Sequence, residues 1–110
     1  MAKVYVLHKA FRWVSGEREV FDYTPANIYG EVVVVFENHR PPGLAQALPR
    51  LRDVFRDYTP ADFLVMSGDT DLVVWASVLA LKATGGRLTL LKWNNRERRY
   101  DPVHAPDGLL

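Results

Sequence analysis

The sequence of 110 residues contains no cysteine. A disulfide framework, a cysteine-ligated zinc site and a catalytic thiol are therefore excluded. A charge imbalance is also missing, because 14 Lys and Arg residues stand against 13 Asp and Glu residues and leave a formal net charge of +1. A chain with so little net charge neither requires nor excludes an anionic partner.

Long hydrophobic runs are absent as well. Lys3, Lys9 and Arg12 interrupt the N-terminal segment, which therefore lacks the apolar region of a secretory signal peptide. The longest apolar stretch, residues 72–81, has about half the length that a membrane span requires. We expect a soluble, cytoplasmic protein without a membrane partner.

The composition is that of one folded domain. Hydrophobic residues make up 48% of the chain and charged residues 25%, close to the average of globular proteins. A chain of this length can build one hydrophobic core but not two ordinary domains. We therefore expect residues 1–110 to form a single domain.

Strand and helix patterns alternate along the chain, which indicates an α/β fold. The expected strands span residues 3–8, 18–23, 32–36, 62–67, 87–93 and 98–103, and the expected helices span residues 44–58 and 71–83. Pro49 predicts either a kink in the first helix or a regular start at Leu48, and Gly85-Gly86 should end the second helix. The β-α-β-α-β order predicts a mainly parallel central sheet. In it the valine-rich strand 32–36 is buried on both faces, and a hairpin at each end of the chain adds an antiparallel edge.

The pentapeptide Asp-Tyr-Thr-Pro-Ala occurs twice, at residues 22–26 and 57–61, each time before an expected strand. In the first copy Thr24 and Pro25 are typical of a helix N-cap and a first helical position, so a short helical turn should follow and end at Gly30. The repeat indicates either a duplicated half-domain or reuse of one start signal, and the sequence does not decide between them.

Carboxylates follow two of the expected parallel strands, at the sheet edge where open α/β sheets bind ligands. Glu37 follows residues 32–36, and Asp69 and Asp71 follow residues 62–67. If these strands are neighbours, the three carboxylates converge, and a cation such as Mg²⁺ would hold them together. The alternative is that Asp69 and Asp71 only cap the helix that follows, which contributes roughly 0.5–2 kcal/mol.

Residues 63–71, FLVMSGDTD, are followed by a helix, by Gly85-Gly86 and by a third strand. This segment resembles one half of NYN-type nuclease domains, relatives of the PIN nucleases. The resemblance implies a Mg²⁺-dependent nuclease in which Asp69, and more weakly Asp71, helps to hold the catalytic metal. Glu37 would then stand where the family's first strand delivers an Asp.

A longer layout joins residues 29–32, YGEV, to FLVMSGD, an apolar helix, GGRLTLLKW and RRYDPV. It resembles a family of short, uncharacterised proteins encoded by tailed bacteriophages. The resemblance implies a phage accessory protein and specifies no activity and no cofactor. Our preferred hypothesis is therefore a non-catalytic protein of the host cell cytoplasm that binds to itself and to a host or phage protein.

The second expected helix is apolar on nearly every side, since Ser77 is the one polar residue among residues 72–81. A helix of this kind is normally buried all round, and a small domain cannot bury a surface helix in that way. We expect a second subunit to cover it in a homodimer, with the N-terminal hairpin as the alternative cover. The side chains to be covered are Val74, Trp75, Val78 and Leu81.

The C-terminal hairpin mixes cations with aromatic rings. Residues 82–110 contain six basic and three acidic side chains. Phosphates bind cations and unstacked bases bind aromatic rings, so this hairpin is a candidate nucleic-acid interface with weak affinity. Alternatively, its charges only keep an edge strand from pairing with another chain. The candidate residues are Lys92, Trp93, Arg96, Arg98 and Arg99.

Overall fold

The computed structural model describes residues 2–37 and 42–110. Its strands are β1 (Lys3–His8), β2 (Phe11–Val14), β3 (Glu17–Val20), β4 (Glu31–Phe36), β5 (Phe63–Val65), β6 (Thr89–Asn94) and β7 (Arg99–His104). Its helices are α1 (Leu44–Arg56), α2 (Thr70–Thr84) and the short 3₁₀ helix η1 (Thr24–Ile28). Within the described ranges, no helix has the length and apolar character needed to cross a membrane.

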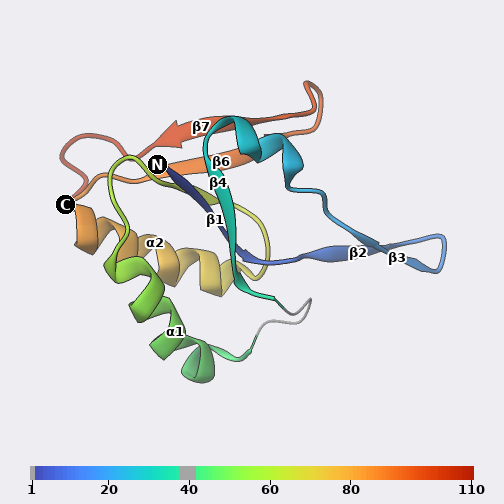
Figure 1. Cartoon of the computed structure of the whole chain (residues 1–110), viewed down its shortest axis with the longest axis horizontal. Coiled ribbons are helices and arrows are strands. Elements are labelled where there is room, and N and C mark those ends of the chain that lie inside the picture. The colour runs from blue at the N-terminus through green and yellow to red at the C-terminus, as the bar shows by residue number, and fades with distance from the viewer. Residues whose placement is uncertain (1, 38–41) are drawn as a thin grey trace.

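The central sheet has five strands in the order β4-β1-β5-β6-β7 (Figure 1). Strands β4, β1, β5 and β6 are parallel, and β7 is antiparallel to β6. The predicted α/β fold, with a mainly parallel sheet and an antiparallel C-terminal hairpin, is confirmed.

The predicted N-terminal hairpin is present, but it is not an edge of the central sheet as expected. Residues 3–8 do not form its first arm, because β1 lies in the middle of the central sheet and is buried from Val4 to His8. Strands β2 and β3 instead pair with each other in a separate two-stranded sheet, which extends away from the body of the molecule (Figure 1).

Strand β4 is an edge strand and is not buried on both faces as expected. Of its four valines only Val35 is buried, and the others are partly exposed. The strand that is buried on both faces is β1, because β4 and β5 flank it and both faces of the sheet are covered at this point.

The direction of each crossover explains which face of the sheet it covers. The chain moves one way across the sheet from β4 to β5 and from β5 to β6, so right-handed crossovers place α1 and α2 on the same face. It moves the opposite way from β1 to β4, which places η1 on the other face. Figure 1 shows the two helices together on one side of the sheet.

Two buried clusters lie on these two faces. The helix-side core contains Tyr5 and Leu7 of β1, with side chains of both helices. The hairpin-side core contains Val4 and Val6 of β1, with Tyr23, Ala26 and Tyr100 among its other members. The alternation of β1 side chains between the faces is that of any strand in a covered sheet.

Both predicted helices are confirmed. Helix α1 buries Ala47, Leu51 and Phe55, which recur every four residues, and Pro49 lies inside it on the exposed side. Helix α2 ends as predicted, because Gly85 takes the left-handed conformation with φ 68° and the Gly86 N–H donates to the carbonyl of Leu81.

The two copies of the repeated pentapeptide start different structures. In the first copy Thr24 is not the N-cap as predicted, since Tyr23 holds that position and the Thr24 N–H donates to Asp22 Oδ1. The second copy leads into a turn that the buried Asp62 closes. Asp62 accepts hydrogen bonds from the backbone N–H and hydroxyl of Thr59 and from the Lys3 N–H, which ties β1 to the start of β5.

Candidate functional site

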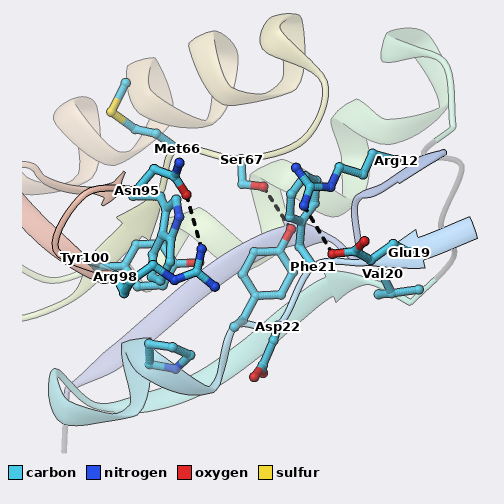
Figure 2. Close-up of a pocket in the computed structure, with 13 residues that line it drawn as sticks. Arg12, Glu19, Val20, Phe21, Asp22, Met66, Ser67, Asn95, Arg98 and Tyr100 are labelled. Carbon is cyan, nitrogen blue, oxygen red and sulfur yellow. Dashed lines mark hydrogen bonds and ion pairs between the residues drawn. The ribbon is translucent and has the colours of Figure 1, made fainter. Parts of the chain in front are cut away.

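The central sheet has a topological switch point between β1 and β5. The chain leaves β1 toward β4 on one side and later returns to β5 on the other side. Open α/β sheets bind ligands outside the carboxyl ends of their strands at such a point. A pocket of about 530 Å³ opens near this point, beside the carboxyl ends of β5 and β6, and its volume is within the range of small-molecule sites (Figure 2).

The wall that the C-terminal hairpin contributes is aromatic and cationic. Trp93 and Tyr100 are direct cross-strand partners, with ring centroids 4.9 Å apart and an interplanar angle of 63°. The Arg98 guanidinium lies 5.7 Å from the Trp93 ring centroid, and its Nη1 donates to Asn95 Oδ1 at 3.3 Å. Burial raises the pKa of Tyr100 to about 12, so this phenol stays neutral.

The opposite wall comes from the N-terminal hairpin and the segment after it. Arg12 and Glu19 are cross-strand partners and form an ion pair at 3.2 Å. The Arg12 guanidinium also lies 5.7 Å from the Phe21 ring centroid. Each wall therefore presents an arginine on an aromatic ring, but only Arg12 has a carboxylate partner among these pocket residues.

Tyr23 joins the two halves of the site. Its hydroxyl lies 2.8 Å from Ser67 Oγ and accepts a hydrogen bond from the Ala10 N–H at 3.3 Å. Tyr23, Ser67 and Met66 all line the pocket. The hydroxyl bond fixes the segment after β3 against the turn that leads from β5 into α2.

His8 fills the space between the ends of β1 and β5. Its Nε2 accepts a hydrogen bond from the Asp69 N–H at 2.9 Å, so the proton of the neutral ring is on Nδ1. Nδ1 is buried without a hydrogen-bond partner among the described residues. Gly68 is required beside the ring, because its φ is 102° and a Cβ there would collide with the imidazole.

The structure does not bring the three predicted metal-binding carboxylates together. The premise that residues 32–36 and 62–67 form neighbouring strands is wrong, because β1 lies between β4 and β5. Glu37 forms an ion pair with Lys9 at 3.6 Å. Within residues 2–37 and 42–110, no group of three or more His, Asp or Glu side chains is placed to hold a metal ion.

The predicted capping role falls to one of the two aspartates. Asp69 occupies the N-cap position of α2 but makes no side-chain hydrogen bond there. Asp71 Oδ1 accepts the Leu72 N–H at 3.0 Å. Helix α2 therefore begins with a carboxylate in its first turn, as the sequence predicts, and with the backbone of Asp69 bound to His8.

The predicted basic hairpin is divided between the two faces of the sheet. Cross-strand partners share a face and neighbours along a strand alternate, so Trp93 faces the pocket while Lys92 and Arg99 face the other way. Arg99 Nε pairs with Asp101 at 3.0 Å, and hydrogen bonds from Asn94 and Arg99 lower the Asp101 pKa. Of the five candidates, Trp93 and Arg98 line the pocket, and Arg96 is exposed in the turn.

The outer face of α2 is apolar and exposed. Val74, Trp75 and Val78 are 46%, 45% and 49% exposed, respectively. The fourth predicted residue differs, because Leu81 is partly buried against the helix-side core and only borders this surface. We call the exposed side chains of Val74, Trp75 and Val78 the α2 stripe.

Sequence reasoning missed the N-terminal half of the pocket. Arg12, Phe21 and Tyr23 lie 70 to 81 residues before Trp93 in the chain, and only the strand order brings them to the same edge. The one signal for Tyr23 was its place in the repeated pentapeptide, since a tyrosine before a Thr-Pro start has a structural reason to be there.

Together these features define a small open α/β domain with a pocket beside the carboxyl ends of two of its parallel strands, β5 and β6. A family model described as "Phage Pam3 gp32-like protein" matches residues 2–106. The chain belongs to this phage protein family, and the match is not to the nuclease domains that residues 63–71 resemble. No curated protein and no solved structure matches the chain.

Proposed function

We propose that this phage protein acts by binding in the host cytoplasm and that it self-associates through the α2 stripe. The observation that carries the proposal is the exposure of three large apolar side chains on one side of an otherwise packed helix. Contiguous exposed apolar surface of this kind marks interaction sites more often than free surface. The same helix buries Leu72, Ala76 and Ala80 on its inner side, so its outer side is the part left to a partner.

The charges around the α2 stripe favour a second copy of the chain as the partner. Asp71 and Lys82 are exposed at the two ends of the helix, and helical spacing places both on the same side as the stripe. A two-fold axis between residues 76 and 77 brings Trp75 of one copy against Val78 of the other. The same axis sets each Asp71 opposite a Lys82, so the surface is complementary to itself, as a symmetric dimer requires.

A matched pair of variants tests the interface. Val78→Glu places a charge in the α2 stripe, while Val103→Glu places the same charge at a site of similar exposure on β7. Light scattering at micromolar concentration should give a lower mass for Val78→Glu only. Equal masses for both variants and the unmodified protein would rule out the α2 stripe.

Charge reversal tests the antiparallel arrangement separately. Asp71→Lys alone sets two cations against each other across the axis and should raise the dimer dissociation constant. The double variant Asp71→Lys with Lys82→Asp restores opposite charges and should recover most of the affinity, less the effect of reversing charges at the helix ends, about 0.3–1 kcal/mol each. A double variant that is weaker than the single one would contradict this geometry.

A further inference from the structure

We propose that the pocket between the two hairpins binds one nucleotide unit, a flat base together with its phosphate. The unit can come from a free nucleotide or from a single-stranded nucleic acid, because both present the same chemistry. This site is independent of the α2 stripe, since its tyrosines belong to the hairpin-side core and α2 covers the opposite face of the sheet.

The aromatic side chains of the pocket suit a flat ring. Phe21 on one wall and Trp93 on the other are partly exposed, at 42% and 36%, and each carries an arginine against its ring. Unstacked bases bind aromatic rings and guanidinium planes through their faces. A base between these walls meets such a surface on both sides, and Asn95 offers an amide for its polar edge.

The charges of the pocket indicate where the phosphate binds. Glu19 already neutralises Arg12. Asp22 accepts the Thr24 N–H, and in Figure 2 its carboxylate points away from Ser67 and Arg98. Arg98 donates to the neutral amide of Asn95. It also lies within residues 82–110, which contain six basic and three acidic side chains. Arg98 is therefore the cation of the pocket that is placed to pair with a phosphate.

The backbone at Arg98 supports a role for this side chain. Its φ is 56°, in the left-handed region that Gly and Asn adopt more readily than Arg. Non-glycine residues in this region cluster at ligand sites, where the surrounding structure holds them. The left-handed residue ends the turn between β6 and β7, with its guanidinium over Trp93.

An acidic peptide is the competing ligand. Its carboxylate would pair with Arg98, but it would leave the two aromatic walls without a flat group between them. Ribose 5-phosphate tests the same point, because it carries the phosphate without a base. The proposal requires that 5′-AMP or 5′-UMP binds at least about fivefold more tightly than ribose 5-phosphate, the ratio that corresponds to the weakest usual stacking of a base on an aromatic side chain.

The experiment titrates the full chain with 5′-AMP, 5′-UMP, ribose 5-phosphate, an acidic peptide and a ten-nucleotide single strand by calorimetry and tryptophan fluorescence. Arg98→Gln should weaken nucleotide binding by about tenfold or more, as expected for a lost charge-assisted hydrogen bond. Arg96→Gln removes the same charge from the same turn outside the pocket and should change the affinity by less than about twofold, within the usual range of screened surface charges. Equal melting temperatures of the two variants exclude unfolding as the cause.

The source of the nucleotide unit follows from the same titrations. Binding of the monophosphates as tightly as the single strand assigns a free nucleotide. A single strand that binds much more tightly, with a log–log salt slope of about −0.7 for one phosphate, assigns a nucleic acid threaded through the pocket. No binding of any nucleotide or single strand at millimolar concentration, an equal loss in Arg96→Gln and Arg98→Gln, or a preference for the peptide would overturn the proposal.

Discussion

The face of the sheet that α1 and α2 cover is closed by aliphatic and aromatic packing, whereas the opposite face is covered by η1 and hydrogen-bonded tyrosines and keeps a pocket. The helix-side core contains Leu51, Phe55 and Leu72, which are all fully or almost fully buried. On the other face the Tyr23 hydroxyl connects distant segments, and Tyr29 donates to the carbonyl of Tyr100 at 2.8 Å. We therefore expect the helix side to supply most of the stability, and the other face to supply a surface with polar groups in fixed positions.

The largest expected effect is on the helix side. Phe55→Ala removes a fully buried ring that packs 5.3 Å from Tyr5 and 5.9 Å from Tyr58, measured between ring centroids. We expect the free energy of unfolding to fall by about 3–5 kcal/mol in urea denaturation, because a cavity remains where the ring was. A loss below about 1 kcal/mol, the usual effect of a surface substitution, would contradict the assignment of stability to this face.

The next largest effect is expected at Gly68, in the turn between β5 and α2 that packs against His8. Gly68→Ala adds a methyl group that collides with His8, at a backbone φ of 102°. Gly85→Ala is the control, because its φ is also positive but no atom lies within 4 Å of the added carbon. We expect Gly85→Ala to lower the free energy of unfolding by about 1 kcal/mol. Gly68→Ala should lower it clearly more in the same urea denaturation experiment. Equal costs would show that the His8 contact does not constrain the turn.

On the pocket side a single hydroxyl should matter. Tyr23→Phe keeps the ring but removes the hydroxyl that bonds to Ser67 and accepts the buried Ala10 N–H. We expect the free energy of unfolding to fall by about 1–3 kcal/mol, since the buried N–H of Ala10 is left without a hydrogen-bond acceptor. Ser67→Ala removes only one of these bonds and should cost less. If Tyr23→Phe is as stable as the unmodified protein, the hydroxyl does not hold the two halves of the pocket together.

Alkaline pH should reduce stability through tyrosines on both faces. Burial raises the pKa of Tyr5 and Tyr58 on the helix side, and it raises that of Tyr100 to about 12 on the pocket side. The unfolded chain loses these protons near pH 10 while the folded chain keeps them. The stabilisation is therefore complete below pH 10 and is lost as the pH rises toward 12. Urea midpoints measured across this range should decline, and the decline should be shallower in Tyr100→Phe.

The smallest expected effect concerns Mg²⁺. The metal alternative needs Glu37, Asp69 and Asp71 in one site, and the strand order separates Glu37 from the other two. We expect millimolar Mg²⁺ or Mn²⁺ to leave the melting temperature unchanged, because an ion stabilises a protein only when it binds the folded state. A clear rise that Asp69→Asn abolishes, together with cleavage of single-stranded RNA or DNA by the unmodified protein, would reinstate the nuclease hypothesis.

Periodicity located most elements because it reports local structure. The stripe of α1, the Gly85-Gly86 end of α2 and the strands on either side were predicted to within a few residues. Strand order was not predicted, because apolar content did not distinguish the edge strand β4 from the central strand β1. Residues 32–36 are four valines and a phenylalanine, yet they lie at the edge, while residues 3–8 include Lys3 and His8 and lie in the middle.

Only half of the candidate site was predicted from the sequence, because the order of the strands was not predicted. Trp93 and Arg98 stood out because cations and aromatics cluster locally in the C-terminal hairpin. On the other wall Arg12 lies in a hairpin that was expected at the sheet edge, and Phe21 directly follows that hairpin. The expectation of a carboxylate cluster failed through the same error in strand order.

The mass of the unmodified protein in solution tests the central claim most directly. If a second copy covers the α2 stripe, light scattering at micromolar concentration gives about twice the chain mass of 12.6 kDa. A mass of 12.6 kDa, unchanged as the protein concentration rises through the micromolar range, would contradict self-association through α2.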